Sequence, residues 1–271
     1  FWLKFLIVAE VMATLARKMA TLRRGPRCHR HFSSAVSAIP VGTPGTTEFR
    51  IFYERDSKRI SPWHDIELRA EEAGLVNFAC EIPKFTRAKF EVNVKEHSNP
   101  IAQDLKKGKL RDYPGPIYWN YGCLPQTWED PNAIWGELGL GGDKDPLDLV
   151  EVGSGAMVTG GLARVRPLGV LAMIDDGELD WKVIGISVED PMAGEIRGLR
   201  DLEERVPGVV SGIREWFRWY KTPDGKPVNQ FGYKEECLDE KIAMQIIEEA
   251  HQQWRKLVEG EVDPCGVWTG R

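Results

Sequence analysis

The sequence lacks the features that mark several large protein classes. No run in its 271 residues approaches the roughly 18 apolar residues that a membrane-spanning helix needs, so we expect no membrane insertion. Five cysteines are scattered without a CxxC pair and five histidines without HxxxH spacing, which argues against a disulfide framework and a zinc site and favours a reducing compartment. The P-loop, dinucleotide-binding and GxSxG nucleophile motifs are also missing.

Acidic residues are missing from one part of the chain. Residues 11–47 contain no Asp or Glu, and residues 1–47 sum to +6 because seven Lys and Arg oppose Glu10. The formal net charge of the whole chain is −5, so residues 48–271 carry −11. An acidic body opposes binding to a phosphate backbone, so we expect no nucleic-acid partner.

The basic leader has the composition of an organellar transit peptide, rich in Arg and containing Ser. We expect residues 1–47 to be a disordered leader and residues 48–271 to form a single domain. The segment 30–33 is similar to a mitochondrial cleavage site, so the mitochondrion is favoured over the plastid, with a cytoplasmic location if the leader has no function. Met12 is a plausible true start. The competing interpretations are a basic tail that binds a partner or anionic lipid, and a secretory signal.

The body changes its hydrophobic period along the chain. Alternating or continuous apolar runs bounded by Pro, Gly or Asn predict strands at 48–56, 75–82, 88–94, 160–174 and 181–188. Apolar residues at helical spacing predict helices at 195–206, 209–220 and 241–258. Short strands followed by helices favour a mainly β domain with flanking α, in which the C-terminal helices pack around a β-barrel.

The most informative segment is a Gly-rich loop with three carboxylates in six residues, Asp143, Asp145 and Asp148. Two like charges 4 Å apart repel by on the order of 4 kcal/mol at an effective dielectric near 20, so this packing is costly unless a cation lies among them. Oxygen ligands without His or Cys select hard divalent ions, Mg²⁺ first and Mn²⁺ or Ca²⁺ next. The spacing fits an EF-hand poorly. Taken alone, the triplet is equally compatible with a solvated acidic loop.

Further acidic and basic groups alternate along the chain. Residues 175–182 place several carboxylates and one Lys at a turn between two apolar runs. Lys89 and Glu91, two residues apart, share one face of a predicted strand. Residues 106–111 and 220–221 add more cationic groups. Carboxylates to hold metals, with Lys and Arg to bind oxyanions, are the equipment of metal-assisted phosphoryl transfer.

These segments resemble the motifs of the family I inorganic pyrophosphatases of the eukaryotic type, over roughly residues 48–260 and in the family's order. The matching segments are 81–84, 107–111, 119–122, 125–131, 143–149, 175–182, 216–221 and 223–227. The resemblance implies an OB-like five-stranded β-barrel and Mg²⁺-dependent hydrolysis of pyrophosphate to two phosphates. It also implies three to four Mg²⁺ per active site, with Mn²⁺ as a substitute.

The resemblance assigns roles position by position. Asp145 would accept the proton of the attacking water. The metal ligands would be Asp143, Asp148, Asp180, Asp175 and Glu91. The groups that bind the phosphates would be Lys89, Arg111, Tyr121, Lys182, Tyr220 and Lys221. Glu81 and Arg218 would belong to the same cavity and contact these residues, without binding metal or phosphate directly.

Two departures from the family pattern affect these expectations. Lys144 stands where the family usually has Asn or a small polar residue, so its charge is expected to weaken metal binding unless the side chain faces solvent. The connection at residues 112–117 is shorter than in fungal and animal members, which leaves monomer and homodimer both open. The alternative functions are a catalytically secondary OB-type subunit of a larger assembly, and a phosphatase for organic phosphates.

Overall fold

The N-terminal boundary of the domain differs from the sequence expectation. The computed structural model describes residues 36–270. Within it, β1 (Val36–Val41) pairs antiparallel with β2 (Arg50–Arg55), so the folded part begins before the expected boundary at residue 47. Most β1 side chains are exposed, so the strand lacks the apolar alternation that identifies a strand in sequence. Met12 and the segment 30–33 lie outside the described residues.

Five strands close into a barrel. They are β4 (Val76–Ile82), β9 (Asn120–Cys123), β10 (Asp148–Glu151), β11 (Leu162–Asp175) and β12 (Glu178–Ser187). The pairing runs β4, β9, β10, β12, β11 and returns to β4, because β11 pairs with both β12 and β4. Only β10 and β12 are parallel among these pairs. This circuit confirms the predicted OB-like five-stranded barrel.

Shorter strands extend the barrel. One antiparallel sheet contains β1, β2, β3 (Lys58–Ile60), β5 (Phe90–Val92) and β6 (Ile101–Gln103). A separate hairpin is formed by β7 (Leu105–Lys106) and β8 (Lys109–Leu110). Two short strands add to β11, namely β13 (Gln230–Phe231) and β14 (Leu238–Asp239). Single 3-10 turns lie at η1 (Gly136–Leu138), η2 (Thr222–Asp224) and η3 (Tyr233–Glu235).

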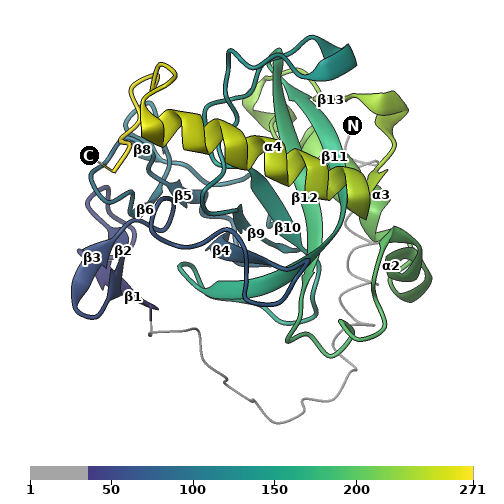
Figure 1. Cartoon of the computed structure of the whole chain (residues 1–271), viewed down its shortest axis with the longest axis horizontal. Helices are drawn as coiled ribbons and strands as arrows, with labels where there is room; N and C mark the ends of the chain where they lie inside the picture. Colours follow the sequence, from purple (N-terminus) through teal and green to yellow (C-terminus); the bar gives the residue numbers. More distant parts are fainter. Residues whose placement is uncertain (1–35, 271) are drawn as a thin grey trace.

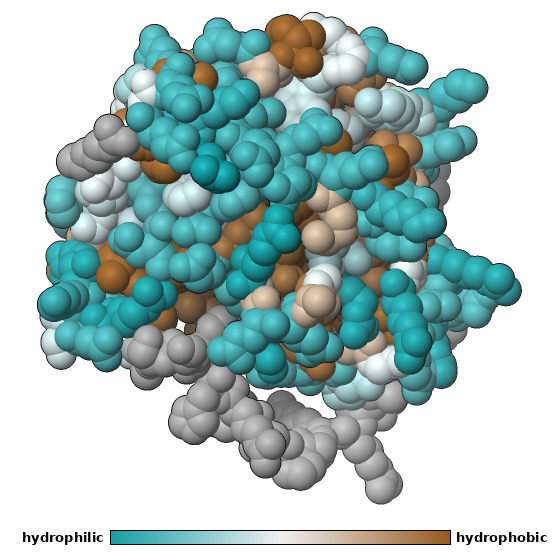
Figure 2. Space-filling view, viewed as in Figure 1, coloured by the Kyte–Doolittle hydropathy of each residue, from teal (hydrophilic) through white to brown (hydrophobic). Residues whose placement is uncertain are grey.

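The three predicted helices are present as α2 (Leu199–Arg205), α3 (Val209–Trp219) and α4 (Glu240–Glu259). The long α4 lies across the barrel (Figure 1). Its first turn is capped by the Asp239 carboxylate, which accepts hydrogen bonds from the amides of Lys241 and Ile242, and it ends at Gly260, whose φ of 79° suits glycine. The face of the molecule that carries α4 is mostly hydrophilic, with hydrophobic residues in small separate groups (Figure 2).

The barrel strands are buried on both sides. Leu149 of β10 packs in the apolar cluster that includes α4, and its neighbour Val150 packs in the cluster that includes α2 and α3. Successive side chains of a strand point to opposite faces, so the two faces of β10 belong to different apolar clusters. Within residues 36–270, no helix is long and apolar enough to cross a membrane. The four cysteines of this part are free thiols.

Candidate active site

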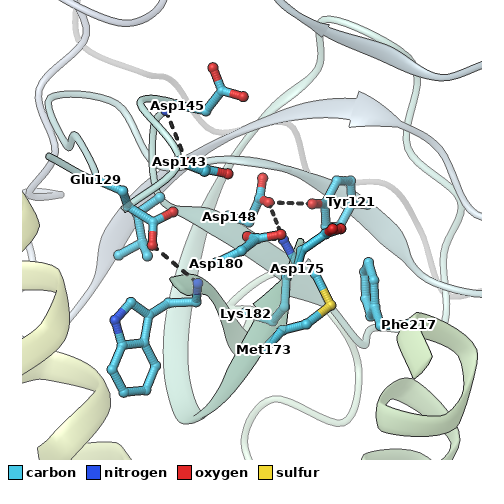
Figure 3. Close-up of polar contacts among 12 residues, drawn as sticks. Tyr121, Glu129, Asp143, Asp145, Asp148, Met173, Asp175, Asp180, Lys182 and Phe217 are labelled. Carbon is cyan, nitrogen blue, oxygen red and sulfur yellow. Dashed lines mark hydrogen bonds and ion pairs between the residues drawn. The ribbon is translucent and has the colours of Figure 1, made fainter. Parts of the chain in front are cut away.

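Acidic residues from three strands meet at one end of the barrel. Asp148 is the first residue of β10, and its partner across the parallel pairing is Lys182 of β12. Asp175 is the last residue of β11, and Asp180 lies near the start of β12, on the other side of the connecting turn. Strand pairing therefore brings together carboxylates that are up to 32 positions apart in the sequence (Figure 3).

A cavity of about 510 Å³ opens at this end of the barrel. It is lined by thirteen of the fourteen predicted site residues: Glu81, Lys89, Glu91, Arg111, Tyr121, Asp143, Asp145, Asp148, Asp175, Asp180, Lys182, Tyr220 and Lys221. The wall also contains Asp104 and Tyr113, which the sequence analysis did not single out. The predicted constellation is therefore a single site in space.

Arg218 is the exception and corrects the expectation that it belongs to this cavity. Its guanidinium bonds Glu215 and Glu235, the latter at 2.8 Å, and lies over the ring of Phe231. It precedes Tyr220 by two positions, about 200° around a helix of 3.6 residues per turn. The face of α3 that carries Arg218 is therefore turned away from the cavity.

The acidic loop is held in place by backbone pairing with the segment before it. The Glu129 amide donates to the Asp145 carbonyl at 3.0 Å, the Lys144 amide to the Glu129 carbonyl at 3.0 Å, and the Gly142 amide to the Asp130 carbonyl at 3.0 Å. A Cβ at Gly142 would lie 2.4 Å from the Glu129 carbonyl group, so only glycine permits this approach. The backbone that carries the carboxylates of the loop is therefore held in a fixed position.

Lys144 is exposed and does not line the cavity. Its φ of 77° lies in the left-handed region, which Asn adopts more readily than Lys. The side chain faces solvent. In this arrangement, the charge of Lys144 is not expected to weaken metal binding.

Lys182 is the central cation of the site. Its side chain is 1% exposed, and its ammonium group pairs with Asp148 at 2.5 Å and also with Asp180. The Tyr121 hydroxyl donates to the same oxygen of Asp148. Burial acts to lower the pKa of Lys182, but Asp148 and Asp180 outweigh it and raise that pKa well above its usual value. Lys182 therefore stays charged and partly neutralises the carboxylates around it.

Two further groups of ion pairs stand around the cavity. Lys89 pairs with Glu91 and lies 3.4 Å from Asp104, which also accepts a hydrogen bond from Arg111 at 2.8 Å. Asp104 thus joins two predicted phosphate-binding residues, and nothing in its sequence surroundings indicated this role. On the other side, Asp175 pairs with Lys221 and accepts a hydrogen bond from the Tyr220 hydroxyl at 3.1 Å.

The carboxylates are electrostatically strained. Burial, followed by Asp145, raises the pKa of Asp143, and burial together with Asp143 and Asp148 raises that of Asp180 against the opposing effect of Lys182. Desolvation by the surrounding walls of the cavity, followed by the charge of Glu91, raises the pKa of Asp145 to about 7, although the side chain itself is exposed. Such a concentration of like charge is typical of a site that binds a cation.

The donor set fits a hard divalent cation. Carboxylate oxygens of Glu129, Asp143 and Asp180, one from each, all lie within 4.8 Å of one another. These donors are all oxygen, which selects Mg²⁺, Mn²⁺ or Ca²⁺ over softer metals. Glu129 was missed as a site residue because only one other acid, Asp130, stands beside it in the sequence, and an isolated pair of acids does not indicate a metal site.

Comparison with known proteins identifies the family. A sequence profile described as inorganic pyrophosphatase matches residues 78–255. The chain belongs to this family. This pyrophosphatase is 49% identical over 227 residues to soluble inorganic pyrophosphatase 1, chloroplastic, of Chlamydomonas reinhardtii, covering 84% of the chain and 81% of the relative. It is 45% identical over 238 residues to soluble inorganic pyrophosphatase 6, chloroplastic, of Arabidopsis thaliana, covering 87% and 79%.

A solved structure agrees with this assignment. The crystal structure of type I inorganic pyrophosphatase from Toxoplasma gondii superposes with a TM-score of 0.79 at 45% identity, covering 82% of this chain and 100% of that one. The chain is therefore a hydrolase that acts on pyrophosphate in a family whose activity depends on metals. The alternative of a non-enzymatic subunit is not favoured, because the predicted metal-binding and phosphate-binding residues all line one cavity.

Proposed function

We propose that this pyrophosphatase uses Mg²⁺ to hydrolyse pyrophosphate to two phosphates, and that Asp145 accepts the proton of the attacking water. The observation that carries the proposal is the cavity itself, in which carboxylates and cationic side chains face the same space. Mg²⁺ bound to the carboxylates supplies charge neutralisation of the substrate and lowers the pKa of a water. The remaining contributions come from the side chains of the chain.

The cationic and phenolic groups bind and orient the substrate. Lys182, Lys221 and Arg111 offer charge-assisted hydrogen bonds to phosphate oxygens, and the planar guanidinium of Arg111 can engage two oxygens at once. Lys89, Tyr121 and Tyr220 complete this set along the wall. As the bridging bond breaks, negative charge develops on the leaving phosphate, and fixed cations beside it stabilise that charge.

The Asp145 carboxylate differs from the neighbouring ones in accepting no hydrogen bond within residues 36–270, whereas Asp143 accepts one from the Asp145 amide at 3.0 Å. Asp148, Asp180 and Asp175 each pair with a Lys, whereas among residues 36–270 no hydrogen bond or ion pair reaches the Asp145 carboxylate. Its side chain is open to the solvent of the cavity. A carboxylate that accepts no hydrogen bond and faces solvent is suited to accept a proton. The proposed metal ligands are the four carboxylates paired with Lys, namely Asp148, Asp180, Asp175 and Glu91, together with Asp143. Glu81 also lines the cavity, and its carboxylate accepts a hydrogen bond from the Val92 amide at 2.7 Å.

The activity is tested with three substrates. Phosphate release from pyrophosphate, ATP and a phosphomonoester is measured with Mg²⁺, with Mn²⁺ and with EDTA. We expect rapid release from pyrophosphate only, dependent on the metal. Equal release from the monoester would indicate an organic phosphatase, and no release from any substrate would contradict the assignment.

The role of Asp145 is tested by Asp145→Asn. Loss of a positioned general base typically lowers kcat by about 10²–10⁴-fold. Asp224→Asn is the matched control, because Asp224 lines the same cavity but pairs at 2.7 Å with Lys106, which is not among the proposed site residues. If Asp145→Asn kept the activity of the control, the assignment would be wrong.

We also propose three to four Mg²⁺ per active site, a plastid location and a monomeric or homodimeric state. Two relatives are named chloroplastic, which supports the plastid, whereas no relative reported above supports the mitochondrion that the leader favoured. Residues 12–47 fused to a fluorescent reporter test the compartment. A mitochondrial or diffuse cytosolic signal would contradict plastid import. Light scattering on the purified protein measures the oligomeric state.

A further inference from the structure

A buried glutamate beside the acidic loop has one oxygen without a partner. Glu129 is 0% exposed. Its Oε1 accepts a hydrogen bond from the Trp181 amide at 3.1 Å, whereas its Oε2 has no hydrogen-bond partner in the described part of the chain. This second oxygen points toward Asp143 and Asp180 (Figure 3). A buried oxygen that accepts no hydrogen bond is unfavourable unless a proton or a cation occupies the space before it.

The backbone fixes Glu129 in this position. Its amide and carbonyl groups both bond to the acidic loop, to the Asp145 carbonyl and the Lys144 amide, and Gly142 allows the two segments to touch. With the Trp181 hydrogen bond, the main chain and one carboxylate oxygen are held at the same time. The free oxygen therefore faces the acidic residues as a consequence of the fold, and not through a flexible side chain.

The local charge is not balanced by protein groups. Four carboxylates, those of Glu129, Asp143, Asp148 and Asp180, gather around one ammonium group, that of Lys182, which is already engaged by Asp148 and Asp180. Ionised, this group of five carries a charge of about −3, and one divalent cation reduces it to about −1. Oxygens of Glu129, Asp143 and Asp180 lie within 4.8 Å of one another, a separation that a single cation can bridge.

We propose that Glu129 supplies an oxygen ligand to a divalent cation that it shares with Asp143 and Asp180. The inference rests on the proposed metal dependence of the site and adds a ligand that the acidic loop and the β11–β12 turn do not contain. Under this proposal Glu129 contributes to metal affinity. The competing interpretation is that Glu129 only stabilises the fold, by accepting the hydrogen bond from the Trp181 amide.

The test is Glu129→Gln, which keeps the size of the side chain and an oxygen for the Trp181 amide but removes the negative charge. Mn²⁺ binding is measured by electron paramagnetic resonance and calorimetry without pyrophosphate, and thermal unfolding is measured in EDTA. We expect the Kd of the tightest Mn²⁺ site to rise about 10–100-fold, the loss typical of a removed metal-site partner. We expect the melting temperature in EDTA to stay equal or to rise, because one of the crowded charges is gone.

Glu151→Gln is the matched control. Glu151 is also buried, at 2% exposed, but its oxygens accept from Gly153, Ser187 and Asn120, and it does not line the cavity. This variant is expected to lower the melting temperature in EDTA and to leave Mn²⁺ affinity unchanged. The same pattern in Glu129→Gln, or a Kd within twofold of the parent, would overturn the proposal.

A second variant covers the case in which Glu129→Gln does not fold. Glu129→Asp keeps the charge and withdraws the oxygens by one methylene, so it should fold and bind Mn²⁺ more weakly, whereas parental affinity would refute the ligand role. Because binding is measured without substrate, the result is independent of whether pyrophosphate is hydrolysed. Weaker Mn²⁺ binding in a protein that releases no phosphate would support the inference and contradict the proposed function.

Discussion

Replacing Lys182 by Met should destabilise the metal-free protein strongly. The Lys182 side chain is 1% exposed, and its ammonium group is the partner of both Asp148 and Asp180. Met preserves most of the volume but leaves the two carboxylates without their cation. Removing one partner of a buried ion pair costs about 3–5 kcal/mol. A loss of about 4 kcal/mol corresponds to a melting temperature lower by roughly 8–16 °C in a domain of this size.

The loss should depend on pH in a defined direction. Burial raises the pKa of Asp180 and Lys182 opposes that rise, so removing Lys182 raises the pKa further. Asp180 then keeps its proton to a higher pH in the folded variant than in the unfolded chain, so this group makes the stability of the variant fall as the pH rises above the ordinary pKa of Asp. The deficit relative to the parent should therefore be smaller at pH 5 than at pH 8.

Urea unfolding in EDTA at pH 5, 6.5 and 8 measures this effect, with an unchanged m-value as the sign that the unfolded state is comparable. Lys226→Met is the control, because Lys226 pairs with Asp176 at 2.9 Å but its side chain is 54% exposed. An exposed pair contributes about 0–1 kcal/mol. The reasoning is refuted if Lys182→Met costs no more than this control, or if its deficit is the same at pH 5 and pH 8.

Three other predictions concern stability. Lys144→Asn should raise the free energy of unfolding by about 1 kcal/mol, because φ at this position is 77°; an equal or lower value in urea unfolding would contradict the strain. His64 accepts from the Trp254 indole at 2.8 Å, its other nitrogen lies 2.9 Å from the Trp268 carbonyl, and burial lowers its pKa. The unfolded chain thus takes up a proton first as the pH falls from 7 to 5, so the stability advantage of the parent over His64→Gln should shrink over that range, and a constant difference would argue against it. Mg²⁺ at about 100 times its Kd should stabilise the fold by about 2.7 kcal/mol, measured as a melting temperature that EDTA returns to its starting value, and no shift would exclude binding to the folded state.

Local patterns predicted all three helices but only five of the fourteen strands in the described residues, and the four-residue barrel strands β9 and β10 were not among them. The apolar spacing over residues 241–258 predicted α4, because a helix that covers a barrel must bury one face. Closure of the barrel depends on β11 pairing with both β4 and β12, and no periodicity within β11 reveals two partners. That part of the architecture came from the family resemblance. The strand β1 was missed because its side chains are largely exposed.

Site residues could be predicted where several charged residues lie close together in the sequence. They could not be predicted where only tertiary contacts bring them together. Three acids in six residues drew attention to Asp143, Asp145 and Asp148. Glu129 approaches them only because the backbone of Glu129 and Asp130 pairs with the acidic loop, and sequence spacing does not reveal this contact. Arg218 is the opposite case, since the helical phase relative to Tyr220 already places it on another face of α3.

The arrangement of charges explains why the site needs both signs. In the structure, predicted phosphate-binding cations pair with predicted metal-binding carboxylates: Lys89 with Glu91, Lys182 with Asp148 and Asp180, and Lys221 with Asp175. Each pair holds two side chains in the cavity and offsets their desolvation. A metal without an anion, or an anion without a metal, must compete with these internal partners. If both bind, each carboxylate would exchange its ammonium partner for a metal ion, and each ammonium would exchange its carboxylate for a phosphate oxygen. We therefore expect metal and pyrophosphate to strengthen each other's binding.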